Sequence, residues 1–85
     1  MEIEMSPRAL TDLEKWRKSG NKQVKKRITD LTNSILETPF GGIGKPEPLR
    51  YEMTGLWSRR ITKEDRFVYE VQEQVIIVHS LKGHY

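Results

Sequence analysis

The run Val75-Ile76-Ile77-Val78-His79-Ser80-Leu81 decides the fold expected for this chain. It is apolar at consecutive positions, so both of its faces are predicted to be buried, as in a central strand. Three segments before it alternate apolar and polar residues, the period of strands with one buried face. These segments are residues 49–53, 57–62 and 66–71. Short turns join all four strands, which predicts an antiparallel meander.

A helix is predicted from Pro7 to about Lys18, after a short strand at residues 3–5. Ser6 is the expected N-cap, and Pro7 takes the first helical position, where its missing N–H is not needed. Apolar residues at a spacing of three predict the face that packs on the sheet. They are Ala9, Leu10, Leu13 and Trp16.

A second helix is predicted up to Thr38, because the residue before Pro39 avoids the helical conformation. Its apolar face is marked by spacings of four, three and four residues. The residues are Val24, Ile28, Leu31 and Ile35. Basic residues occupy the rest of its first half, namely Lys22, Lys25, Lys26 and Arg27. Such a cluster is either a solvated face or a surface that binds phosphate or a partner.

The predicted order is β-α-α-β-β-β-β, an α+β fold with a helical hairpin packed on a mainly antiparallel twisted sheet. With 85 residues, of which 35% are hydrophobic, we expect one domain over residues 1–85 with a small core. There is no cysteine and there are only two histidines, so no metal or cofactor is expected. Without a membrane-spanning run or a signal peptide, a soluble cytoplasmic protein is expected.

Lys and Arg number 15 against 12 Asp and Glu, a net charge of +3 that permits a polyanionic partner without requiring one. Residues 40–48 predict a loop whose three glycines allow close approach to a ligand. Pro46 and Pro48 stiffen this loop on both sides of Glu47. The loop lacks the Gly-Lys-Ser/Thr ending of a P-loop, which argues against nucleotide binding.

Polar strand positions, the loop and the last two residues could form one concave basic surface on the sheet face away from the helices, which is expected to be open. The candidates are Glu47, Arg50, either Arg59 or Arg60, Arg66, His84 and Tyr85. Cleavage of RNA without a metal needs a base for the 2′-OH, an acid for the 5′-oxygen, and cations for the developing charge. An aromatic side chain can stack on a base. The residue types leave a small basic binding module open as the other interpretation.

Four blocks, in order and properly spaced, resemble the signature of the YoeB/Txe toxins of the RelE superfamily. They are TPFGGIGKPEPL at 38–49, GLWSRRIT at 55–62, RFVY at 66–69 and HY at 84–85. The resemblance implies a RelE-like fold and a metal-independent, ribosome-dependent messenger-RNA endoribonuclease that inhibits translation. Such a protein is the toxin of a bacterial type II toxin–antitoxin pair.

The resemblance also implies partners and roles. A YefM/Phd-type antitoxin, messenger RNA and the ribosomal A site are the expected partners; operator DNA is contacted only through the antitoxin complex, and a homodimer is allowed. The implied roles are general base for Glu47, transition-state stabilisation for Arg66, general acid for His84, substrate orientation for Tyr85, and RNA or phosphate binding for Lys45, Arg50, Arg59 and Arg60. The alternative is a non-catalytic basic module retained for antitoxin or operator-complex assembly.

The chain departs from the family at three of the positions that bear on the site. Arg50 stands where lysine is common, and Tyr51 stands where histidine is frequent. Gly83 is expected to loosen the backbone just before His84. None of these departures removes a predicted catalytic group.

Overall fold

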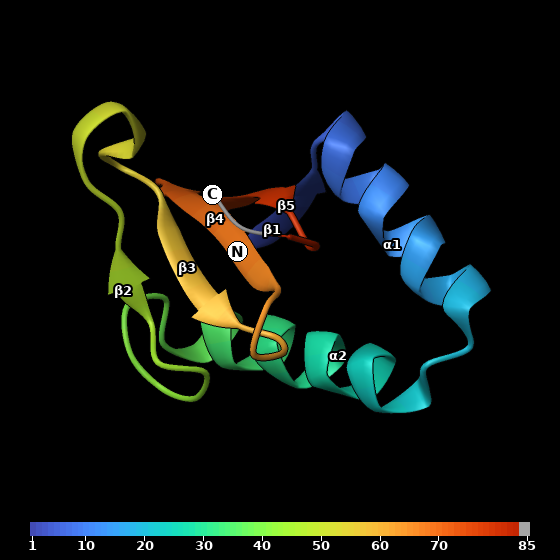
Figure 1. Ribbon diagram of the computed structural model, residues 1–85. Helices are drawn as coiled ribbons and strands as arrows, with labels where there is room; N and C mark the ends of the chain where they lie inside the picture. The colour runs from blue at the N-terminus through green and yellow to red at the C-terminus, as the bar shows by residue number, and fades with distance from the viewer. Residues whose placement is uncertain (84–85) are drawn as a thin grey trace.

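A twisted sheet with two helices packed against it makes up the computed structural model, which describes residues 1–83 (Figure 1). The elements are β1 (Glu2–Met5), α1 (Pro7–Ser19), α2 (Lys22–Glu37), β2 (Glu47–Pro48), a 3₁₀ helix (Tyr51–Met53), β3 (Trp57–Arg60), β4 (Arg66–Gln72) and β5 (Val75–Ser80). None of the helices in this described part is long and apolar enough to cross a bilayer.

The five strands are ordered β1-β5-β4-β3-β2. β1 runs parallel to β5, and all other neighbours are antiparallel. β5 therefore lies between two strands, and its residues Ile76 and Val78 are at most 1% exposed. The predicted α+β class, the element order and the mainly antiparallel sheet are confirmed.

Both helix starts follow from local hydrogen bonds. The Ser6 hydroxyl accepts from the Ala9 N–H at 3.0 Å, which confirms Ser6 as the N-cap of α1. Gly20 ends α1 in the left-handed conformation, with φ 71°. The Asn21 side chain then caps α2 by accepting from the Val24 N–H at 3.0 Å. The chain turns here because the residue that ends α1, Gly20, is followed directly by the residue that caps α2, Asn21. The two helices diverge from this turn (Figure 1).

The core lies between the helices and one face of the sheet. All four predicted apolar residues of α2 are buried, at 0–7% exposed. They pack with side chains from the sheet, including Phe67, Tyr69, Ile76 and Val78. Burying one such apolar side chain contributes roughly 1.5–3 kcal/mol relative to leaving it in water, so this cluster is the main stabilising contact of α2.

The predicted face of α1 is wrong at one position. Leu10 is 55% exposed, whereas Asp12 is only 4% exposed. Leu10 lies one residue from the fully buried Ala9, which on a helix is a rotation of about 100° away from the sheet. Asp12 is buried because its carboxylate accepts from the Leu81 N–H at 3.0 Å.

The strand predicted at residues 49–53 is also wrong. β2 has only two residues, Glu47 and Pro48, and the chain then forms the 3₁₀ helix. Tyr51 has φ 58° and is 88% exposed, so its position in the alternation marks no buried face. The apparent period of two came from a turn.

Candidate active site

Residues from three neighbouring strands share one face of the sheet near the β2 edge. Glu47 lies opposite Ser58, and Arg60 lies opposite Arg66. Directly paired residues point to the same face, and so do residues two apart on one strand. Glu47, Arg60 and Arg66 therefore stand on one face, on the adjacent strands β2, β3 and β4 (Figure 1).

The centre of this face is buried, whereas the sequence predicted an open surface. Ser58 is 1% exposed and Val68 is 3% exposed. The Ser58 hydroxyl has no hydrogen-bond partner within residues 1–83. Glu47 and Arg60 are exposed and Arg66 is half-buried, so the charged groups occur at the rim of a closed centre.

Arg59 does not belong to this surface, and its predicted role in phosphate binding is corrected. It is paired with Phe67 across β3 and β4, and it is 0% exposed. Consecutive residues on a strand point to opposite faces. Arg60 therefore faces the candidate site, and Arg59 points toward the helices.

The Arg59 guanidinium binds four oxygen atoms inside the protein. They are the Thr38 carbonyl (2.7 Å), the Ser34 hydroxyl (2.8 Å), the Ile43 carbonyl (2.9 Å) and the Tyr69 hydroxyl (3.1 Å). Burial raises the pKa of Tyr69, while the bond from Arg59 opposes that shift. The Tyr69 hydroxyl in turn donates to the Pro39 carbonyl at 2.7 Å. Arg59 and Tyr69 thus hold the start of the loop that leads to Glu47.

The glycines of this loop serve packing against α2, whereas the sequence suggested approach to a ligand. The Gly44 carbonyl accepts from the Arg60 N–H at 2.7 Å, which joins the loop to β3. A Cβ at Gly44 would lie 2.6 Å from Leu31 Cδ2, and Leu31 is fully buried. The loop therefore requires glycine at residue 44 in order to approach the helix.

Leu81, just after β5, is anchored to α1 on both sides of its peptide backbone. Its N–H donates to Asp12, and its carbonyl accepts from the Trp16 indole at 2.7 Å. The Arg8 guanidinium donates to the Lys82 carbonyl at 3.2 Å. α1 thereby fixes the direction in which the chain leaves the sheet.

Gly83 is fixed at the beginning of β4. Its N–H donates to Asp65 Oδ1 at 2.8 Å, and its carbonyl accepts from the Arg66 N–H at 3.1 Å. The expectation that Gly83 loosens the backbone is therefore wrong, because both of its polar backbone groups are bound. The predicted acid His84 and the predicted orienting residue Tyr85 lie outside the described residues.

The candidate phosphate contacts occupy different environments. Arg50 and Lys45 are both exposed, whereas Arg66 is half-buried. Arg66 Nη1 donates to the carbonyls of Thr62 and Lys63 at 3.1 and 3.2 Å, so its side chain lies against the β3–β4 turn.

Two of the four basic residues in the first half of α2 bind other parts of the protein. Lys26 pairs with Asp30 at 2.8 Å, and Arg27 donates to the Arg60 carbonyl at 3.3 Å. Both contacts are solvent-exposed. They favour the interpretation of a solvated helix face.

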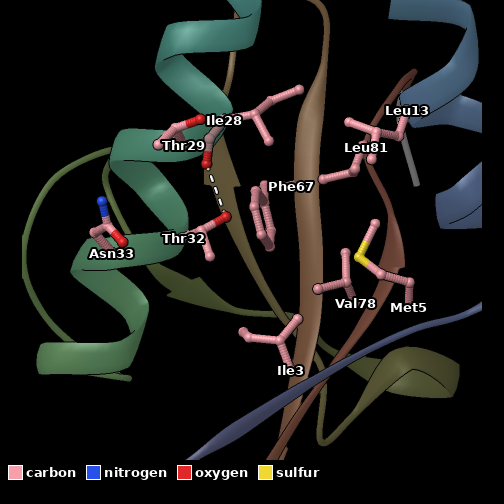
Figure 2. A pocket seen from close by; sticks show the side chains of 10 residues that line it. All are labelled: Ile3, Met5, Leu13, Ile28, Thr29, Thr32, Asn33, Phe67, Val78 and Leu81. Atoms are coloured by element: carbon pink, nitrogen blue, oxygen red, sulfur yellow. Dashed lines mark hydrogen bonds between the residues drawn. The ribbon is translucent and has the colours of Figure 1, made fainter. Parts of the chain in front are cut away.

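Two hollows border these elements. One, of about 480 Å³, is lined by Glu47, Pro48, Leu49, Arg50, Tyr51 and Met53. The other, of about 270 Å³, is mainly apolar and lies on the helix face, where Phe67 and Val78 of the sheet and Ile28 of α2 are among its lining residues (Figure 2). The first hollow contains the predicted base, whereas the second shares no residue with the predicted site.

Comparison with known proteins identifies the family. The family model described as the YoeB-like toxin of bacterial type II toxin–antitoxin systems matches residues 5–85. The chain belongs to the YoeB toxin family. The resemblance inferred from the four sequence blocks is confirmed, and this YoeB-family protein is the toxin of a type II toxin–antitoxin system.

Similarity to individual YoeB toxins extends over nearly the whole chain. The chain is 38% identical to Toxin YoeB of Escherichia coli K12 over 85 residues, covering 100% of both chains. It is 43% identical to Toxin YoeB of Synechocystis over 70 residues, covering 82% of this chain and 81% of the relative. The blocks around Glu47, Arg60 and Arg66 lie inside the first alignment.

Solved structures agree with the fold. A YoeB/ParE toxin from Agrobacterium tumefaciens superposes with a TM-score of 0.95 at 39% identity, covering 100% of both chains. The YoeB dimer and the YoeB–YefM complex of Staphylococcus aureus give TM-scores of 0.88 and 0.87 at 41% and 42% identity, each covering 100% of this chain and 98% of the other. The five-stranded arrangement that groups Glu47, Arg60 and Arg66 is thus the YoeB fold.

Two carboxylates that the sequence did not single out hold the chain after β5. They are Asp12, which accepts from the Leu81 N–H, and Asp65, which accepts from the Gly83 N–H. Asp12 had a readable signal, since it lies three residues after Ala9 and four before Trp16, on the buried stripe of α1. Asp65 had none, because its partner Gly83 is 18 residues away.

Proposed function

We propose that this toxin is a metal-independent messenger-RNA endoribonuclease that acts on the ribosome. The proposal rests above all on one arrangement: Glu47, Arg60 and Arg66 share a face, and Gly83 is bound to the N–H of Arg66. A carboxylate and two cations thus share one side of the sheet, and the residue before His84 is bound to the start of β4.

The reaction follows from these groups. Glu47 accepts the proton of a ribose 2′-OH, and the O2′ attacks the adjacent phosphorus. Arg66 stabilises the negative charge on the phosphorane, with Lys45, Arg50 and Arg60 binding neighbouring phosphates. The bond from phosphorus to O5′ breaks as His84 donates a proton to O5′. Tyr85 orients the substrate. The products are a 2′,3′-cyclic phosphate and a 5′-hydroxyl.

The proposed partners follow from the family and from the named complexes. The Staphylococcus aureus YoeB–YefM complex supports a YefM-type antitoxin for this toxin, and the YoeB dimer supports a homodimer. Operator DNA would be bound only through the antitoxin complex. Messenger RNA in the ribosomal A site of the cytoplasm is the proposed target.

Induction of the gene in growing bacteria tests the enzymatic proposal. Wild type should arrest growth, and Glu47→Ala and His84→Ala should each relieve the arrest. Removal of a general base or acid lowers the rate by on the order of 10²–10⁴-fold. The matched control is Glu52→Ala, which removes an exposed carboxylate from the neighbouring 3₁₀ helix and should still arrest growth. Arrest by the Glu47→Ala and His84→Ala variants alike would favour a non-catalytic binding module.

A further inference from the structure

The 3₁₀ helix after β2 displays an aromatic ring to solvent. Tyr51 is 88% exposed, more than any other large apolar side chain within residues 1–83, where the next are Leu10 and Phe40 at 55%. An exposed aromatic ring gives up the stabilisation that burial would supply. Fold stability therefore does not explain this side chain.

The backbone at Tyr51 is strained and fixed at the same time. Its φ of 58° lies in the left-handed region, which residues with a side chain seldom adopt. Thr54 donates to the Tyr51 carbonyl twice, from its N–H at 3.1 Å and from its hydroxyl at 2.7 Å. The Met53 N–H donates to the Arg50 carbonyl at 3.1 Å. Strain of order 1–3 kcal/mol persists where surrounding bonds impose it, and such positions cluster at ligand-binding sites.

Tyr51 borders the hollow that contains the predicted base. Together with Glu47 and Arg50 it lines the cavity of about 480 Å³, whose other walls are Pro48, Leu49 and Met53. Arg50, the residue before Tyr51, is exposed, and Glu47 is exposed at the other end of the same segment. A flat aromatic surface, a cation and an apolar wall therefore adjoin the proposed reaction site.

We propose that Tyr51 is a stacking platform for an unpaired RNA nucleobase whose phosphate is bound by Arg50. Unpaired bases are recognised by stacking on aromatic rings beside cations that bind the backbone. This inference rests on the proposed function, because it adds a base-binding subsite next to the same reaction centre. It restricts the substrate to RNA that is single-stranded beside the scissile phosphate.

Four substitutions at Tyr51 distinguish a role for its aromatic ring from a role for side-chain volume alone. Stacking contributes about 1–3 kcal/mol per base, so Tyr51→Ala should raise KM for messenger cleavage about 5- to 150-fold with little change in kcat. Tyr51→Phe and Tyr51→Trp keep a ring and should stay within about threefold of wild type. Tyr51→Leu keeps bulk without a ring and should resemble Tyr51→Ala. Thermal unfolding should show all four variants folded, because the side chain is exposed.

A binding experiment locates the base. The probes are single-stranded RNA hexamers with 2′-O-methyl groups, which cannot undergo 2′-OH attack, each with an abasic residue at one position. At one position, the abasic residue should weaken binding of the RNA to the wild-type protein. The same abasic RNA should bind Tyr51→Ala as tightly as the intact RNA does, because the stacking partner is already absent. The same series in programmed ribosomes distinguishes the source. If the effect of Tyr51→Ala disappears when one messenger position is abasic, Tyr51 stacks on the messenger base at that position. If Tyr51→Ala weakens binding equally with every abasic messenger, the stacked base belongs to the ribosome.

Equal KM for Tyr51→Ala and wild type, or equal KM for Tyr51→Leu and Tyr51→Phe, overturns the stacking platform. Its failure is distinguishable from failure of the proposed function. If Glu47→Gln is inactive while Tyr51→Ala has the KM of wild type, only the stacking site is rejected. Full turnover by Glu47→Gln rejects the proposed enzymatic function, while the hexamer experiment still decides base stacking.

Discussion

The backbone N–H of Arg66 donates to the carbonyl oxygen of Gly83 at 3.1 Å, which joins the first residue of β4 to the residue before His84. The Gly83 N–H is bound as well, by the carboxylate of Asp65 at 2.8 Å. Two consecutive residues, 65 and 66, thus bind both polar backbone groups of Gly83. The proposed transition-state cation and the segment that leads to the proposed acid are positioned by the same turn.

Asp65→Ala should lower activity because Gly83, the residue before the proposed acid, loses a contact that holds it in place. We expect kcat for messenger cleavage to fall about 10- to 100-fold, since small misplacements of catalytic groups have effects of this order. The free energy of unfolding should fall by about 1–3 kcal/mol, because the Gly83 N–H loses its acceptor. Single-turnover cleavage and urea unfolding measure the two effects.

Thr62→Val is the matched control for this prediction. It removes the 2.7 Å bond from the Thr62 hydroxyl to Asp65 but leaves the bond from Gly83 to Asp65 in place. Stability should fall while kcat stays within about threefold of wild type. An Asp65→Ala protein with unchanged kcat would show that the Gly83 anchor does not position the site.

Arg59 and Arg60 should respond oppositely to substitution, although they are neighbours. Arg59→Ala leaves several buried oxygens without a donor, so the free energy of unfolding should fall by at least about 3 kcal/mol. Arg59→Lys keeps the charge but not the planar fork, and should cost about half as much. Arg60→Ala should change stability by no more than about 0.5 kcal/mol while weakening RNA binding. Urea unfolding and RNA titration of the three variants check this, and similar stability losses at both positions would contradict it.

Gly44 and Gly55 distinguish close packing from backbone strain. Both have positive φ, 84° and 100°, but a Cβ would meet Leu31 and Arg59 only at Gly44, with open space at Gly55. Gly55→Ala should cost about 1–2 kcal/mol from strain alone. Gly44→Ala should cost about 2–5 kcal/mol, since overpacking adds about 1–3 kcal/mol. Equal losses in urea unfolding would mean that residue 44 is not required to approach α2.

Glu70 should make stability depend on acidic pH. The pKa of its carboxyl is lowered from the ordinary 4.5, chiefly by the hydrogen bond from Gln72 and also by His79. A carboxyl with a lower pKa in the folded state stabilises the fold above pH 4.5, and this contribution is lost as pH falls through the lowered value. The stability difference between wild type and Glu70→Gln should therefore be present at pH 7 and shrink below pH 4.5 in urea unfolding. A difference that is constant with pH would contradict this linkage.

The sequence predicted those parts of the structure that depend on local chemistry. Ser6 caps α1 through its own hydroxyl, and the α2 stripe is buried because helical period alone aligns it. The 3₁₀ helix at Tyr51–Met53 was missed because its alternation of apolar and polar residues equals that of a strand. Only the positive φ of Tyr51 and the bonds from Thr54 reveal the turn.

The sequence predicted which residue types form the candidate site, but it did not predict which face of the sheet each side chain occupies. The pair Arg59-Arg60 has one residue on each face of β3, and no local pattern states which face the helices cover. The assignment depended on the register between β3 and β4, which pairs Arg59 with Phe67. The anchors of Leu81 and Gly83 likewise depend on contacts between distant residues, which composition and spacing do not encode.

Analysis of the RNA ends produced by the purified toxin on programmed ribosomes tests the central claim most directly. With a divalent-metal chelator present at a level that leaves the ribosomes intact, cleavage should persist. It should yield upstream fragments with a 2′,3′-cyclic phosphate or a 3′-phosphate and downstream fragments with a 5′-hydroxyl, and Glu47→Ala should abolish both. Downstream fragments that carry a 5′-phosphate would contradict attack by the 2′-OH and, with it, the assigned roles of Glu47, Arg66 and His84.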